Sequence, residues 1–84
     1  MIAERASGRS RAMPAPSRWH PSNAYERRLV RTLAAYVVEG SHKAAAHRLD
    51  VSESTCRQRV SQLMRLVDAR TSAEAVWLLR EQLR

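Results

Sequence analysis

Two helical apolar patterns lie very close together between positions 42 and 67, and this closeness constrains the fold more than any other feature. The first pattern is a short alanine-rich run over 42–49. The second runs over about 53–67, with a stripe that predicts one buried helix face: Cys56, Val60, Leu63 and Val67. Residues 49–52, where the first pattern ends and the second begins, have room only for a tight turn. The segment therefore predicts two helices braced against each other, with the apolar Val51 fixing their angle.

Capping signals place two further helices around this pair. Asn23 is a good N-cap with Glu26 at capping-box spacing, and Gly40 is a typical helix end. A fourth helix starts at Thr71 or Ser72, and Ser41 and Ser52 are the expected N-caps of the two helices between them. The apolar positions of the first and fourth helices are Leu29, Val30, Leu33 and Val37, then Ala75, Val76, Leu78, Leu79 and Leu83. With no strand signal, we expect an all-α domain of four helices over 23–84.

Residues 1–22 differ in composition from the rest of the chain. They contain three prolines and four arginines against one acid, with Gly8 and several serines between them. This composition predicts a flexible basic arm. Trp19 is its one large apolar side chain, and it either docks on the domain, docks on a partner or stays exposed. About sixty residues then remain to fold, a marginal size that a partner chain could support.

The charge of the chain restricts its partners. The net charge is +7 and the isoelectric point is about 11.3, which suits a polyanion such as DNA, RNA or an anionic membrane surface. Lys43 is the single lysine among fifteen basic residues. Arginine favours bidentate contacts with phosphate and guanine, although the GC-rich codons of a bacterial or phage genome explain the excess equally well.

Several classes of protein are disfavoured. There is no apolar run long enough to span a bilayer and no secretory signal, and one cysteine cannot form an internal disulfide. We expect a cytoplasmic, nucleoid-associated protein. His42 and His47 are five residues apart and do not share a helix face, so we expect no metal and no other cofactor. No catalytic constellation is visible, and we expect no enzyme.

The helix over 53–67 has a polar and basic face opposite its apolar stripe. No acid occurs between Glu53 and Asp68. A slim helix of this kind can enter the major groove of DNA, where its first turns reach base edges. The residues of this face are Ser54, Arg57, Gln58, Ser61, Gln62 and Arg65.

Residues 52–76, SESTCRQRVSQLMRLVDARTSAEAV, resemble the LuxR-type helix-turn-helix DNA-binding domain. The pattern typical of that family begins S-E-x-T-V-x-x-H and ends, in the fourth helix, with E-A-V. Cys56 takes the position of the valine and Arg59 that of the histidine. The residues that match without a gap are Ser52, Glu53, Thr55, Glu74, Ala75 and Val76.

The first half of the domain departs from the LuxR-type pattern, because the stretch before 42 is about three residues too long. Residues 29–40, LVRTLAAYVVEG, instead resemble the first helix of PucR-type helix-turn-helix domains. Region 4 of bacterial sigma factors has similar helices but lacks the E-A-V helix. The LuxR-type and PucR-type resemblances both imply sequence-specific binding of double-stranded DNA in transcription regulation.

The resemblance assigns roles to individual residues. Thr55 and Lys43 would contact phosphates, while Arg57, Gln58 and Arg59 would face bases in the major groove. Three more residues of the same face would complete the DNA-binding surface. Ser54 lies at the start of the helix, and Gln62 and Arg65 lie toward its end.

The fourth helix implies a homodimer, since LuxR-type domains commonly dimerise through it. Val76, Trp77 and Leu83 would form the dimer or partner interface, with Trp77 exposed as an aromatic anchor. Alternatively, Trp77 packs on its own chain. The N-terminal arm either enters a minor groove or remains a solvated tail.

Two alternatives to a DNA-binding regulator stay open. In the first, the domain binds a sigma factor, RNA polymerase or another regulator, which Trp19 and the Trp77 face would favour. In the second, it binds RNA, although no aromatic stacking platform supports that role. The basic face of the 53–67 helix favours DNA.

Overall fold

The computed structural model describes residues 19–83, and within these residues the fold is all-helical, as the sequence predicts. The expected basic arm falls largely on residues 1–18, outside the described part. None of the helices between positions 19 and 83 combines the length and apolar character that crossing a bilayer requires. The helices are α2 (Ala24–Glu39), α3 (His42–Leu49), α4 (Glu53–Leu66) and α5 (Ser72–Leu78), followed by a 3-10 helix (Arg80–Gln82).

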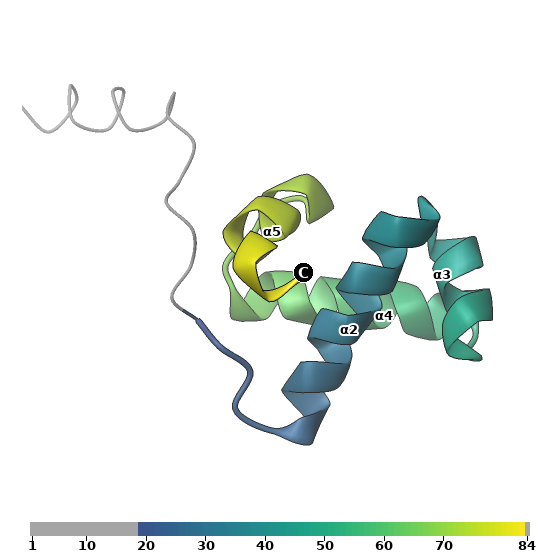
Figure 1. Cartoon of the computed structure of the whole chain (residues 1–84), viewed down its shortest axis with the longest axis horizontal. Coiled ribbons are helices and arrows are strands. Elements are labelled where there is room, and N and C mark those ends of the chain that lie inside the picture. The colour runs from purple at the N-terminus through teal and green to yellow at the C-terminus, as the bar shows by residue number, and fades with distance from the viewer. Residues whose placement is uncertain (1–18, 84) are drawn as a thin grey trace, which may run out of the picture.

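The longer helices α2 and α4 cross and hold the two short helices at opposite ends (Figure 1). Helix α3 packs against both α2 and α4, while α5 packs against the far end of α4. The arrangement leaves one face of α4 uncovered, and this face carries the polar side chains discussed below.

A polar side chain begins each helix, as the sequence predicts. The acceptor is Asn23 Oδ1 for α2, Ser41 Oγ for α3, Ser52 Oγ for α4 and Thr71 Oγ1 for α5, each bonded to the backbone N–H three residues later at 2.8–3.1 Å. Each such cap stabilises a helix by roughly 1 kcal/mol. One detail differs, because the Glu26 carboxylate accepts bonds from Ser22 and not from the backbone N–H of the cap residue itself.

The turn between α3 and α4 is closed by backbone hydrogen bonds. Asp50 adopts a left-handed conformation with φ of 59°. The Val51 N–H donates to Ala46 O at 3.0 Å, and the Asp50 N–H donates to His47 O at 3.2 Å. These two bonds form a Schellman motif, which satisfies carbonyls at the end of α3. Val51 then packs on the buried residues beneath the turn, as expected from its position.

The main core lies where α2, α4 and α5 meet. Leu29 and Leu33 of α2, Leu63 of α4 and Leu79 after α5 are fully buried. The four residues of the predicted apolar stripe of α4 are all buried, with exposed fractions of 9% or less. The cluster consists of Leu29, Val30, Leu33, Val60, Leu63, Val67, Ala75, Leu78 and Leu79.

A second, smaller cluster lies between the short helix α3 and the two long helices, α2 and α4. It contains Ala35, Ala45, Ala46 and Cys56, with Leu49 and Val51 at its border. Because three of the four buried residues are alanines, the α3 backbone can approach α2 and α4 closely. The cluster therefore sets the position of α3 through small side chains.

Two tryptophans border the main core, and both positions decide points that the sequence left open. Trp19 packs against the cluster, and the Gln82 side chain donates a hydrogen bond to its carbonyl oxygen. For Trp77 the sequence left open an exposed interface anchor or packing on its own chain, and the side chain is half-buried against the same cluster, with the Arg80 guanidinium 4.0 Å above its ring. Helix α5 also ends early, at Leu78, so that Leu83 follows the 3-10 helix.

Gly40 ends α2 with φ of +86°, and its N–H donates to Tyr36 O at 2.8 Å. A Cβ atom added there would meet nothing within 4 Å, so the cost of a side chain comes from the backbone alone. We expect Gly40→Ala to lower the free energy of unfolding by about 1 kcal/mol. Urea denaturation followed by circular dichroism measures this loss. Gly40→Asn is the control with a smaller loss, because asparagine tolerates this conformation; equal losses would contradict the explanation.

Candidate nucleic-acid interface

The uncovered face of α4 is a shallow polar hollow of about 420 Å³. Its six lining residues are those of the polar face that the sequence predicts: Ser54, Arg57, Gln58, Ser61, Gln62 and Arg65. They recur at intervals of one, three and four positions, which places them along one side of a helix. The hollow carries two arginines and no carboxylate, so its lining is positive. We call it the α4 face.

Arg57 is held at the edge of the α4 face by an ion pair. Its guanidinium lies 2.6 Å from a carboxylate oxygen of Glu53, one turn earlier on the helix. Both side chains are well exposed, at 60% and 42%, so the pair contributes little to folding stability. The pair orients Arg57 and leaves its charge available to a stronger anion.

Gln62 is anchored at the other edge by the first turn of α2. The Tyr25 hydroxyl donates a hydrogen bond to Gln62 Oε1. This contact fixes one side of the Gln62 amide, and it brings an exposed tyrosine beside the α4 face. Tyr25 is a residue that the sequence did not single out, because only the crossing of α2 over α4 brings it there.

Thr55 lies at the start of α4 and takes part in the cap. Its backbone N–H donates to Ser52 Oγ at 3.0 Å, and the Ser52 hydroxyl donates to Thr55 Oγ1 at 2.9 Å. Thr55 is half-buried and does not line the α4 face. The structure therefore places this proposed phosphate contact beside the polar face and not within it.

Lys43 and Arg59 are also separate from the α4 face. Lys43 is exposed on α3 and lines a different hollow, together with Ser41, Glu39 and Glu53. Arg59 is half-buried and lies roughly 140° around α4 from Ser54, away from the middle of the polar face. The resemblance gave Arg59 a position facing bases, whereas the structure brings together Arg57, Gln58 and their neighbours without it. Ser61, which lies at the centre of the face, takes its place in the set.

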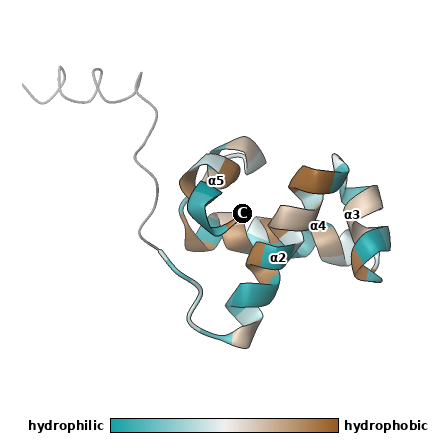
Figure 2. Ribbon diagram, in the orientation of Figure 1, coloured by the Kyte–Doolittle hydropathy of each residue, from teal (hydrophilic) through white to brown (hydrophobic). Residues whose placement is uncertain are grey.

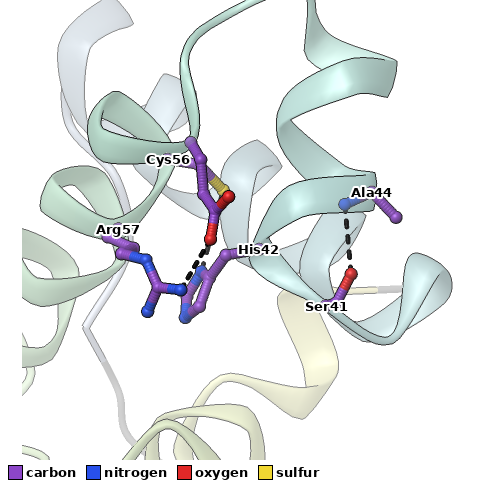
Figure 3. A network of polar contacts seen from close by, with 6 residues as sticks. Ser41, His42, Ala44, Cys56 and Arg57 are labelled. Atoms are coloured by element: carbon purple, nitrogen blue, oxygen red, sulfur yellow. Dashed lines mark hydrogen bonds and ion pairs between the residues drawn. The ribbon is translucent and has the colours of Figure 1, made fainter.

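A titratable pair lies behind the α4 face, where α3 meets α4 (Figure 3). The His42 ring stacks on Tyr36 with 4.5 Å between ring centroids, and its Nδ1 atom is 3.8 Å from Cys56 Sγ. Burial lowers the pKa of His42 below its ordinary value of 6.5, and the charge of Arg57 lowers it further, while Glu53 opposes this. Burial raises the pKa of the Cys56 thiol.

The lowered pKa of His42 makes stability depend on pH. Between pH 6.5 and the lower pKa of the folded state, the unfolded chain binds more protons than the folded chain. The contribution of His42 is therefore fully present above about pH 6.5 and decreases as the pH falls. Urea midpoints measured from pH 7.5 to 5 test this, and His42→Gln should flatten the dependence. If the urea midpoint of His42→Gln falls with pH as steeply as that of the wild type, His42 is not the source of the pH dependence. The matched control is His47→Gln, which alters an exposed histidine and should keep the wild-type slope.

Within residues 19–83, no group of three or more histidine, cysteine or acidic side chains is placed to hold a metal ion. Cys56 is buried, and its thiol contacts the His42 ring. The α4 face places its charged and polar groups on one side of a single helix, where they face solvent and line one hollow.

Comparison with protein-family models, with curated proteins and with solved structures gave no match. The family resemblance of residues 52–76 therefore stays a prediction. What carries the functional argument is the geometry of the α4 face and of the turn that presents it.

Proposed function

We propose that this protein is a sequence-specific double-stranded DNA-binding regulator of transcription, of the helix-turn-helix kind, that inserts α4 into the major groove. The observation that carries the proposal is the α4 face, where six polar or basic side chains line one side of a helix with no acid among them. The helix is braced by α3 across a closed turn, as a recognition helix must be.

The dimensions and chemistry of α4 support this reading. An α-helix with its side chains is about 10–12 Å wide, and the major groove is about 12 Å wide. Arg57 and Gln58 lie in the first turns, where a recognition helix meets base edges. Arginine pairs with guanine and glutamine with adenine through two hydrogen bonds each. Arg65 lies two turns later, suited to a phosphate contact.

The proposal is tested by selection from a pool of random double-stranded DNA at about physiological salt, where nonspecific phosphate contacts are weak. Sequencing of the retained DNA should show an enriched motif. Retention without enrichment, sensitive only to salt, would contradict sequence-specific binding. It would favour the alternative in which the domain binds a sigma factor, RNA polymerase or another regulator.

Arg57→Ala is expected to lower affinity for the selected motif by roughly 1–3 kcal/mol and to relax the preference at one base position. The ion pair with Glu53 is too exposed for its loss to disturb folding. Repeating the selection with the variant measures the effect. Arg59→Ala, which changes a half-buried arginine off the face, should retain the full motif. If Arg57→Ala instead weakens binding to all sequences equally, Arg57 contacts phosphate and does not read a base.

We also propose that the domain acts as a homodimer through α5. Val76 and Trp77 keep part of their surface accessible on that helix, whereas Leu83 faces a groove beside α2. A dimer with two-fold symmetry predicts a palindromic motif in the selection. Sedimentation of the protein with a DNA fragment carrying that motif gives the stoichiometry, and one protein per palindrome would contradict the dimer.

A further inference from the structure

The outer face of α2 carries an unassigned groove. Arg27, Arg31, Ala34 and Val38 follow one another at helical spacing on the side of α2 that points away from the core. Two hollows of about 350 and 280 Å³ lie beside this stripe, one toward Pro21 and Leu83 and the other toward Leu49, and Arg31 and Ala34 line both. We call the stripe and the two hollows beside it the α2 groove.

The walls of the α2 groove are mostly apolar. Pro21 and Leu83 border one end, and Leu49 of α3 borders the other. Val38 is the most exposed large hydrophobic residue of the described chain, at 70%, and Figure 2 shows the C-terminal end of α2 as strongly hydrophobic. Apolar side chains left in water at the end of a groove favour contact with another apolar surface.

The rim of the α2 groove is positive. Arg27 and Arg31 are exposed, and within residues 19–83 neither forms an ion pair. Arg48, on the far side, pairs with Glu39 at 2.7 Å. An occupant must therefore supply apolar side chains for the floor and carboxylates for the rim.

Charge excludes two occupants that the chain itself could supply. Residues 1–18 carry four arginines against one glutamate, so they would bring like charge to Arg27 and Arg31. A second copy placed on the same groove by two-fold symmetry would present the same surface, which has arginines but none of the carboxylates that the rim requires. DNA would match the rim but gains nothing from Val38 and Ala34, and the α4 face shares no lining residue with this groove.

We propose that the α2 groove binds an acidic amphipathic helix of a partner protein. The stripe from Arg27 to Val38 spans about 16 Å, which corresponds to roughly three turns of a docked helix. The apolar face of that helix packs on Ala34 and Val38, and its flanking carboxylates pair with Arg27 and Arg31. This binding does not depend on DNA binding at the α4 face.

The test is selection from a display library of random peptides of about 14 residues, long enough for three turns. The full chain serves as the bait, with counter-selection against Val38→Glu and Arg31→Glu. Both side chains are exposed, so the variants keep the core. We expect enriched peptides that read as amphipathic helices rich in Asp and Glu. Their affinity, measured by fluorescence anisotropy, should fall at least about tenfold with either variant and stay unchanged with Arg65→Glu.

Three results would overturn the proposal. The first is a selection in which no enriched peptide loses affinity for Val38→Glu and Arg31→Glu, or in which only basic peptides are enriched. The second is a loss of DNA affinity in Arg31→Glu as large as that in Arg65→Glu, which would assign the groove to DNA. The third is self-association of the wild-type chain that Val38→Glu abolishes in sedimentation, which would assign the groove to a second copy.

Discussion

Leu63→Ala is expected to unfold much of the protein at room temperature. Leu63 is fully buried in the main cluster, where α4 meets α2 and α5. Removing a buried leucine side chain costs about 2–5 kcal/mol, because the surrounding side chains fill the cavity only in part. A domain of this size has only about 3–5 kcal/mol of stability from its core. The variant should show a large loss in urea or thermal unfolding followed by circular dichroism.

The matched control lies three residues further along the same helix. Leu66 is 43% exposed, so Leu66→Ala makes the same chemical change with little loss of buried contact. We expect it to change stability by about 0.5 kcal/mol or less. Similar losses for the two variants would mean that Leu63 does not occupy the core position described here.

The second large effect concerns DNA. Ser61 lies at the centre of the α4 face and is exposed, so Ser61→Glu adds a carboxylate where the proposed function places DNA. Like charges in contact cost several kcal/mol, so affinity for the selected motif should fall by about a hundredfold or more. Fluorescence anisotropy at fixed salt measures this loss, and circular dichroism confirms that the helix is retained.

Two controls separate the contact from net charge. Ser61→Gln adds similar bulk without charge and should retain most of the affinity. Ala73→Glu adds the same charge at an exposed position of α5, away from the α4 face, and should have a small effect that salt removes. A loss as large in Ala73→Glu as in Ser61→Glu would show that the effect comes from overall charge.

The sequence predicted what depends on neighbouring residues. The caps Asn23, Ser41 and Ser52 and the end at Gly40 form within four residues of their partners, so local spacing was enough to identify them. The bounds of α3 agree with the expected 42–49 for the same reason. The buried stripe of α4 followed from helical periodicity alone.

What the sequence did not predict depends on contacts between distant residues. Arg59 was expected to face bases because of the resemblance alone, and it is half-buried and does not line the α4 face. Trp19 was left undecided because its carbonyl meets Gln82, sixty-three positions later. The bond between Tyr25 and Gln62 joins two helices in the same way.

The two tryptophans of the chain, Trp19 and Trp77, both border the main core and neither borders the small cluster around Ala45 and Cys56. Tryptophan fluorescence therefore reports on one end of the domain only. Indole emission follows the separation of α5 and the residues near Trp19 from α2 and α4. Loosening of α3 changes the far-ultraviolet signal but leaves both indoles in place. A comparison of the two signals thus separates opening at the turn that presents α4 from unfolding of the core.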